Sequence, residues 1–494
     1  MNRMASDRAE TGQKYRPEID GLRALAVIPV ILFHMGWAGI PGGYLGVDVF
    51  FVISGYLITG IIVDKQAAGG FSYSEFWIRR ARRILPALLV MVLGTCAAAV
   101  FLTKGNDTQT LGKVALAAIL SVANVVLWRI TGDYWGEKAE NQELLHTWSL
   151  SVEEQFYFLF PLLLLLGGRI RRLGLGGCVA IVAACSLLLH LVLGRHYVAM
   201  GFYLLPTRAW ELGVGSLLAI WSRHRGPNMP RREIQTWLGI GLICLAYVHD
   251  LRRYAFILPN FCTVLGAFLF VKNSGAAGSK LTELIASGPM RAVGKVSYSL
   301  YLWHWPVIVV CRNLANMGGD PFPVWAIALL ITILSLASYH FIEKPLRFGP
   351  YGLKPILGLA AVALCVAGVL CVFTRQVDLS RYNPVEYRGN EYDATKLMQV
   401  PGAGVAPNPA DTDRSLGTTN RFSEDGVSFR SKPGPMDIVV LGDSHAMMWA
   451  HLLHDHANQQ GKNIAFFVAN GTSPFLGFKS PKLEDTRFKR PTDR

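Results

Sequence analysis

Apolar stretches of about one membrane thickness recur along most of this sequence. They occur near residues 22 to 38, 45 to 63, 84 to 102, 114 to 130, 148 to 167, 176 to 194, 204 to 222, 235 to 250, 256 to 272, 292 to 312, 324 to 342 and 353 to 374. A helix needs about 20 apolar residues to cross a bilayer. Of the 494 residues, 51% are hydrophobic and 17% are charged, which is more apolar sequence than one soluble core needs. The sequence therefore predicts a polytopic α-helical membrane protein.

The net charge of +14 does not indicate nucleic-acid binding, because Lys and Arg fall in short clusters between the apolar stretches. Such clusters usually mark cytoplasmic loops. They lie at the N-terminus and at 79–83, 169–172, 222–232 and 343–354. All of these basic clusters fall on one side of the membrane if residues 114 to 130, which contain Asn124, lie at the outer surface and do not cross it. We therefore expect about 11 spans in a bacterial inner membrane, a cytoplasmic N-terminus and an exported C-terminal part. Twelve spans would place 169–172 and 222–232 outside.

The composition changes after the last apolar stretch. Residues 1–375 form the predicted transmembrane domain, and 376–435, rich in Pro, Gly, Asn, Asp and Thr, are predicted to be a linker. Residues 436–494 contain a strand, turn, helix and strand pattern, which is typical of a parallel α/β domain. Such sheets carry their sites at the carboxyl ends of strands, where Ser444 is expected. Because few residues follow, we expect this α/β domain to be incomplete.

Arg23 and His34 lie at the two ends of the first apolar stretch. Eleven residues at 100° each bring both side chains to one helix face, about 16 Å apart along the axis. Ionisable groups at such depth usually line a cavity or pathway. The alternative is an arginine at one membrane interface and an incidental histidine at the other.

Several ionisable residues are predicted to meet at the outer surface. A histidine beside carboxylates can activate a hydroxyl by accepting its proton. The sequence therefore predicts a reaction site at the outer mouth, and the alternative is a set of helix caps and interfacial charges. The predicted catalytic residues here are His34, Asp48, Glu153 and Glu154, and the predicted substrate-binding residues are Arg208 and Glu211.

Two further motifs supply candidate site residues. Arg79, Arg80, Arg82 and Arg83 form a dense basic cluster. Since guanidinium groups bind phosphate well, they could hold a phosphorylated donor, or they could only set the topology. Tyr298, Tyr301 and His304, in GKVSYSLYLWHWP, either line the same cavity or satisfy one another within the helix bundle. No metal-ligand spacing is present, so no metal is expected.

Several motifs in order resemble one known family. These are GLRALAVIPVILFH, GGYLGVDVFFVISGYLIT, FWIRRARRILPALL, LLHTWSLSVEEQFYFLFPLL, GKVSYSLYLWHWP and FIEKPLR. Across nearly all of residues 15 to 350, the chain resembles the acyltransferase-3 family of membrane O-acyltransferases. The later segment GDSHA resembles the first block of the SGNH hydrolase superfamily, which follows the membrane domain in bacterial O-antigen and peptidoglycan O-acetyltransferases.

The resemblance implies transfer of an acyl group, most simply acetyl, from cytosolic acetyl-CoA to hydroxyls of an envelope glycan. The acceptor would be lipopolysaccharide O-antigen, peptidoglycan or an exopolysaccharide. Arg23 and His34 would be the family's Arg and His pair, with His34 essential. Arg23 and the arginines of 79–83 would bind the cofactor, and Ser444 would be the SGNH nucleophile.

One departure from the SGNH pattern bears on Ser444. The superfamily completes its catalytic triad with a late Asp-x-x-His, which does not follow Ser444 here. We therefore expect either a piece of a longer protein or a second domain that is inactive by itself. Two other functions remain open, namely a glycan or lipid transporter or flippase without chemistry, and an outer-face esterase acting through Ser444.

Overall fold

The computed structural model describes residues 15–102, 108–131, 139, 141–167, 174–225, 233–251, 256–274, 279–316, 321–373, 427–429, 438–442, 460, 462 and 464–468. The chain divides into two compact units, Met1–Arg381 and Tyr382–Arg494. This division lies close to the boundary after residue 375 that the sequence suggests.

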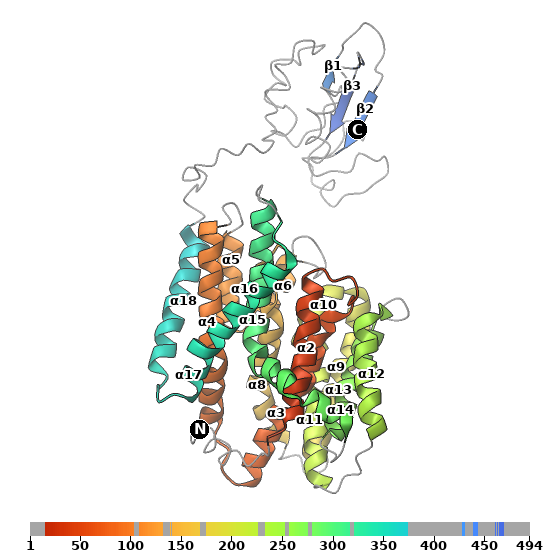
Figure 1. Ribbon diagram of the computed structural model, residues 1–494, viewed down its shortest axis with the longest axis vertical. Coiled ribbons are helices and arrows are strands. Elements are labelled where there is room, and N and C mark those ends of the chain that lie inside the picture. Colours follow the sequence, from red (N-terminus) through yellow and green to blue (C-terminus); the bar gives the residue numbers. More distant parts are fainter. Residues whose placement is uncertain are drawn as a thin grey trace, which may run out of the picture. The chain divides into compact units, whose positions relative to one another are not determined.

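The first unit is helical where it is described (Figure 1). Its α-helices are α2 (Pro17–His34), α3 (Gly46–Ala67), α4 (Tyr73–Leu102), α5 (Thr108–Ile119), α6 (Ala123–Thr131), α8 (Thr147–Gly167), α9 (Gly174–His196), α10 (Val198–Tyr203), α11 (Leu205–Arg225), α12 (Glu233–Val248), α13 (Leu258–Asn273), α14 (Lys280–Ile285), α15 (Gly288–Asn316), α16 (Val324–Ala337), α17 (Lys344–Phe348) and α18 (Lys354–Phe373). A 3-10 turn, η1 (Gly43–Leu45), precedes α3, and a π-helical turn, η3 (Ser338–Glu343), follows α16.

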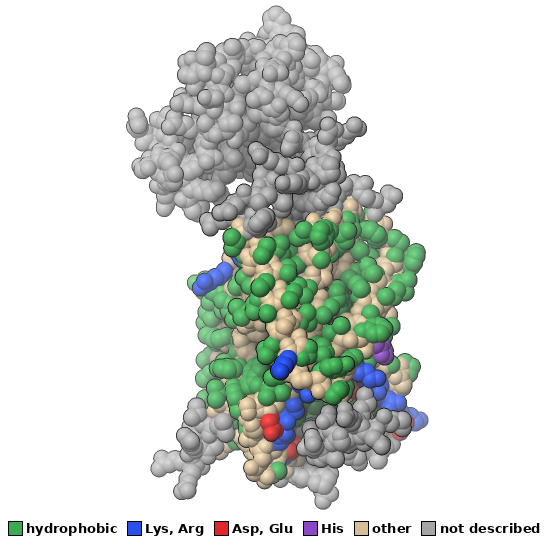
Figure 2. Space-filling model, turned by 90° about the vertical axis from the view of Figure 1, so that its left-hand side faces the viewer, with side chains coloured by type: hydrophobic (Ala, Val, Ile, Leu, Met, Phe, Trp, Pro, Cys, Tyr) green, Lys and Arg blue, Asp and Glu red, His purple; other side chains and the backbone are tan. Residues whose placement is uncertain are grey.

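Within the described residues, five helical segments are long and apolar enough to cross a membrane. They are Gly43–Ala67, Tyr73–Leu102, Gly174–His196, Val324–Phe348 and Lys354–Val372. Figure 2 shows hydrophobic side chains over much of one face, with most of the visible Lys and Arg side chains toward one end. The chain is therefore a membrane protein, and the expected number of 11 spans stays a prediction.

The stretch 114–130, which the sequence analysis kept at the outer surface, is not one continuous helix. Ser121 has a positive φ of 59° and separates α5 from α6. The 12 residues of α5 rise only about 18 Å, which is less than the ~30 Å hydrocarbon core. Neither helix alone could therefore cross a bilayer.

Small residues allow α2 to pack closely against its neighbours. Pro17 and two acidic residues occupy its first turn, which suits the positive end of the helix dipole. A side chain at Gly21 or Gly294 would collide with the backbone carbonyl of Ile285 or Asp20, respectively. The absence of a Cβ thus lets α15 lie directly against α2. The two helices run side by side from Arg23 toward His34.

The basic cluster at 79–83 does not form a loop, contrary to the expectation from the sequence. It lies inside α4, which begins at Tyr73. Arg83 follows the first residue of α4 by ten positions, which is about 15 Å of helix rise. Its arginines therefore occupy successive faces of one helix and reach different surroundings.

The described part of the second unit is a three-stranded sheet in the order β1-β3-β2. β2 (Ile438–Gly442) and β3 (Ile464–Val468) are parallel, as the strand pattern predicted, and Ile438 pairs with Ile464. β1 (Val427–Phe429) pairs antiparallel with β3. Since β1 falls in the predicted linker 376–435, that segment is not wholly irregular. Ser444 lies outside the described residues.

Candidate functional site

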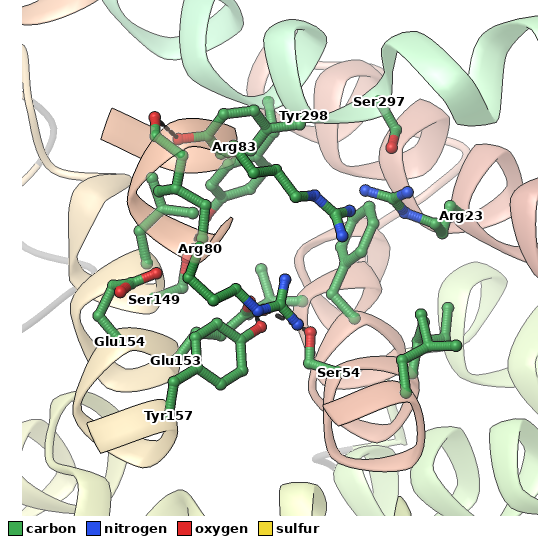
Figure 3. Close-up of a pocket in the computed structure, with 17 residues that line it drawn as sticks. Arg23, Ser54, Arg80, Arg83, Ser149, Glu153, Glu154, Tyr157, Ser297 and Tyr298 are labelled. Atoms are coloured by element: carbon green, nitrogen blue, oxygen red, sulfur yellow. Dashed lines mark hydrogen bonds between the residues drawn. The ribbon is translucent and has the colours of Figure 1, made fainter. Parts of the chain in front are cut away.

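A small cavity lies where α2, α3, α4, α8 and α15 meet, with a volume of about 80 Å³. Figure 3 shows the guanidinium groups of Arg23, Arg80 and Arg83 directed into the same space, with Glu153 and Tyr157 beside them. Its polar lining residues are Arg23, Ser54, Arg80, Arg83, Ser149, Glu153, Glu154, Tyr157, Ser297, Tyr298 and Tyr301. The cavity thus combines residues from the first apolar stretch, the basic cluster and the predicted outer mouth.

The four arginines of the basic cluster have different surroundings. Arg80 and Arg83, one turn apart, line the cavity, whereas Arg79 is exposed and pairs with Glu75 at 3.1 Å. Arg82 donates to the backbone carbonyl oxygens of Leu346 and Gly349, at 3.2 and 2.7 Å. Only two of the four arginines in this cluster therefore face the space that Arg23, the fifth predicted cofactor-binding arginine, also lines.

Glu153 and Glu154 were expected from the sequence to meet His34 at the outer mouth, but they lie elsewhere. Both line the arginine cavity, because α8 carries Glu153 about 9 Å inward from its first residue, Thr147. Glu153 accepts hydrogen bonds from Ser54 and from the hydroxyl of Tyr157, at 3.1 and 2.7 Å. Its carboxylate is thus fixed in orientation.

The guanidinium of Arg80 lies over the ring of Tyr157, 4.7 Å from its centroid. Among the described residues, no carboxylate lies within 4.0 Å of a side-chain nitrogen of Arg80 or Arg83. Two buried or half-buried cations that face a cavity without such a carboxylate form a site suited to an anion or a polarised carbonyl. This electrostatic arrangement is the main chemical property of the cavity.

His34 is in contact with His304, on α15. The Nδ1 atom of His34 lies 3.2 Å from Nε2 of His304, and the edge of Trp305 packs against the His34 ring. The Nδ1 atom of His304 lies 2.6 Å from the backbone carbonyl oxygen of Tyr301. Imidazole, imidazole and carbonyl therefore form one hydrogen-bonded chain.

The direction of this chain follows from the carbonyl, which can only accept. Nδ1 of His304 must carry a hydrogen to donate to Tyr301, so in the neutral ring Nε2 is an acceptor. Nδ1 of His34 then donates to that atom. We therefore assign the lone pair of neutral His34 to Nε2, the nitrogen that can take up a proton.

A third histidine, His146, completes the histidine cluster that we define as His34, His146 and His304. Its ring lies 5.6 Å from that of His304 and is 3% exposed. Neither ring nitrogen has a hydrogen-bond partner within the described part of the chain. His146 was not among the residues predicted from the sequence, although it lies directly before α8, in the same motif as Glu153 and Glu154.

Tyr301 separates the cavity from the histidine cluster. It lines the cavity, and its hydroxyl is hydrogen-bonded to Ser149 at 2.7 Å and donates to the carbonyl oxygen of His146 at 3.1 Å. Its ring centroid is 5.2 Å from that of His304. One aromatic ring therefore stands between the two groups. Tyr298 also lines the cavity and donates its hydroxyl to the carbonyl of Ile84 at 2.8 Å.

Asp48, Arg208 and Glu211 form a separate buried ion cluster. Arg208 contacts Asp48 at 2.7 Å and Glu211 at 2.8 Å, and Asn260 donates to the other oxygen of Asp48 at 2.7 Å. The rings of Phe51, Trp148 and Phe202 surround the guanidinium. None of the three charged residues lines the arginine cavity. The three residues therefore form a cluster of their own, bound to one another and to Asn260, and their predicted grouping with His34 stays a prediction.

Within the described residues, no group of three or more His, Cys, Asp or Glu side chains is arranged to hold a metal ion. His304 contacts both other histidines of the cluster, His34 through a hydrogen bond and ring stacking and His146 through ring packing. The hydrogen bond between the imidazoles of His34 and His304 fixes the orientation of the His34 ring.

Comparison with known proteins identifies both units. A family model described as an acyltransferase domain matches residues 16–341, and one described as an SGNH domain fused to such domains matches residues 411–491. YrhL of Bacillus subtilis, named provisionally as a peptidoglycan O-acetyltransferase, is 32% identical over 364 residues, which are 68% of this chain and 55% of YrhL. O-acetyltransferase OatA of Staphylococcus aureus is 34% identical over 358 residues, which are 68% of this chain and 57% of OatA.

The chain thus spans little more than half the length of these curated relatives. No solved structure is significantly similar to it.

Proposed function

This chain belongs to the acyltransferase domain family, and from that membership we propose that it transfers an acyl group, most simply acetyl, from a thioester to a hydroxyl of a cell-envelope glycan. The names of its relatives support O-acetylation, and that of YrhL supports a peptidoglycan acceptor. O-antigen of lipopolysaccharide and exopolysaccharide are the other acceptors consistent with the chemistry. The observation that carries the proposal is the hydrogen-bonded chain from the Tyr301 carbonyl through His304 to His34.

Acetyl-CoA is the proposed donor, and the arginine cavity is where its acyl end would lie. Arg23, Arg80 and Arg83 suit phosphate or a polarised carbonyl oxygen. The cavity volume of about 80 Å³ is well below the roughly 300–1,000 Å³ of pockets that hold whole ligands. The residues therefore fit the acyl end of the donor and not its nucleotide part.

His34 is the proposed general base. Its Nε2 atom takes the proton of the acceptor hydroxyl as the hydroxyl oxygen bonds to the acyl carbon, and the carbon–sulfur bond of the thioester breaks. The proton then passes to the departing sulfur, so the products are an ester and a thiol. His304 holds His34 in the required tautomer, as the third member of a catalytic triad orients its histidine.

His146 is the proposed donor to the carbonyl oxygen, where negative charge develops. A hydrogen-bond donor fixed in a dry site stabilises such charge more than water does. The ring of His146 meets this requirement because it is buried and its nitrogens have no partner within the described residues. Tyr301 stands between the cavity and these histidines, so its ring must turn aside for the acyl group to pass.

The proposed setting is the bacterial inner membrane, with the N-terminus in the cytoplasm and the second unit exported. The arginine cavity would then lie nearer the cytosolic donor, and the histidine cluster nearer the external glycan. Ser444, in the matched SGNH domain, would be the nucleophile of the second unit. Reporter fusions after residues 70, 170, 228 and 400 test this orientation. The first three should be cytosolic, and a cytosolic signal at 400 would contradict it.

The His34→Ala variant tests the function itself against a transporter or flippase. We expect the ester content of the glycan to fall to background while the amount of surface glycan stays unchanged. His249→Ala, which removes an exposed histidine, is the matched control. Unchanged ester content together with a loss of surface glycan would reject the transferase and favour transport.

A further inference from the structure

A long apolar groove runs along the membrane-facing side of α15, between α2 and α16. Its volume is about 1260 Å³. It is lined by Val296 and Leu300 of α15, by Ile28 and Leu32 of α2, and by Ala328 and Leu336 of α16. Figure 1 shows α16 next to α15, and a hydrogen bond from Ser335 to the carbonyl oxygen of Ser299, at 3.2 Å, joins them. The groove is separate from the arginine cavity.

The two ends of the groove differ in chemistry. At one end lie two partly exposed tryptophans, Trp37 and Trp325, which are 60% and 70% exposed. Tryptophan is enriched where a protein crosses the membrane interface. At the other end the lining residues are Arg291, Lys295, Tyr339 and His340. The groove therefore leads from one membrane interface to a cationic group near the other.

The cationic end carries two neighbouring positive charges. Arg291 and Lys295 are four residues apart on α15, where like charges repel each other. Within the described residues, no carboxylate forms an ion pair with either one, although Arg16, Arg208 and Arg223 are each paired. In addition, the Nε atom of Arg291 is buried without a hydrogen-bond partner among these residues. An anion between the two side chains would reduce the repulsion between their charges and would accept a hydrogen bond from the Nε atom of Arg291.

We propose that this groove binds an anionic phospholipid, whose phosphate Arg291 and Lys295 hold and whose acyl chains lie along α15 and α16. The guanidinium offers paired donors to a phosphate, and the ammonium adds a second charge. A lipid with net negative charge, such as phosphatidylglycerol, complements this end better than zwitterionic phosphatidylcholine does. The proposal does not depend on acyl transfer, because none of these residues lines the arginine cavity.

Native mass spectrometry of the full chain, with each lipid added in turn, tests the proposal. We expect phosphatidylglycerol to bind at about tenfold lower concentration than phosphatidylcholine. Arg291→Ala combined with Lys295→Ala should abolish this preference. Lys280→Ala, which removes an exposed lysine of α14 outside the groove, should keep it. Equal binding of the two lipids by the unchanged chain would overturn the proposal.

Two further variants decide the matter if the double alanine variant does not fold. Exchanging the cations, with Arg291→Lys and Lys295→Arg, should preserve the preference because both charges remain. Ala328→Trp narrows the groove where Ala328 lines it and should reduce binding of phosphatidylglycerol although both cations are present. Undiminished binding of phosphatidylglycerol to the Ala328→Trp variant would show that the groove does not hold this lipid. Detection of a dimer of the chain without bound lipid would show instead that a second copy covers the groove.

Discussion

His304 holds His34 from a neighbouring helix through a 3.2 Å contact between Nε2 and Nδ1, and the Tyr301 carbonyl in turn holds His304. The carbonyl can only accept, so the contact defines which His34 nitrogen can take up a proton. In the proposed reaction, His304 is thus a positioning residue and His34 the base. This division of roles leads to different expectations for substitutions at the two positions.

His304→Ala should lower kcat by about 10²-fold or more, since general-base catalysis contributes roughly 10²–10⁴ and depends on orientation. His304→Gln should recover part of the loss, because its amide oxygen can accept from His34 Nδ1. Acetyl transfer from the thioester to a glycan fragment measures both variants. If the Ala and Gln variants lose activity equally and remain folded, His304 does not act through the tautomer of His34.

His146→Ala should lower kcat by about 10²–10³-fold, which is the usual effect of removing one donor to a developing oxyanion. The KM for the donor should change little, because the interaction is made only in the transition state. His190→Ala is the control, since His190 is also a buried histidine but lies outside the histidine cluster. A rise in KM alone would instead indicate a role in binding the donor.

Arg83→Ala and Arg79→Ala should differ although both remove a charge from one basic cluster. Arg83 lines the cavity, whereas Arg79 is exposed and pairs with Glu75. We expect the KM for the acyl donor to rise about tenfold or more in the first variant, because hydrogen bonds to charged groups are worth about 1.5–3 kcal/mol. Equal effects of the two substitutions would mean that only the summed positive charge matters.

Arg208→Met should destabilise the protein by roughly 3–5 kcal/mol, because it leaves Asp48 and Glu211 buried without their cation. The thermal unfolding midpoint measures this loss. The triple variant with Asp48→Asn and Glu211→Gln as well should recover much of the stability, since no charge remains unpaired. Full stability of Arg208→Met together with a raised KM for the glycan would favour the substrate-binding role that the sequence suggested.

The sequence by itself determined which side chains share one helix face. Arg23 and His34 lie eleven residues apart on α2, and Tyr298, Tyr301 and His304 follow one another at helical spacing on α15. The parallel strands β2 and β3 were also predictable, because strand pattern and turn residues are local properties of the chain. Helical periodicity is likewise set by the backbone alone.

Only the tertiary structure decided which of these faces meet, and at what depth. Periodicity could not show that α4 begins at Tyr73 and so carries Arg83 about 15 Å inward. It also could not show that α8 brings Glu153 to the same cavity, or that Asp48 pairs with Arg208, 160 residues away. Contacts between helices depend on where small residues such as Gly21 and Gly294 allow backbones to approach. That property belongs to pairs of helices, so no single segment of the sequence contains it.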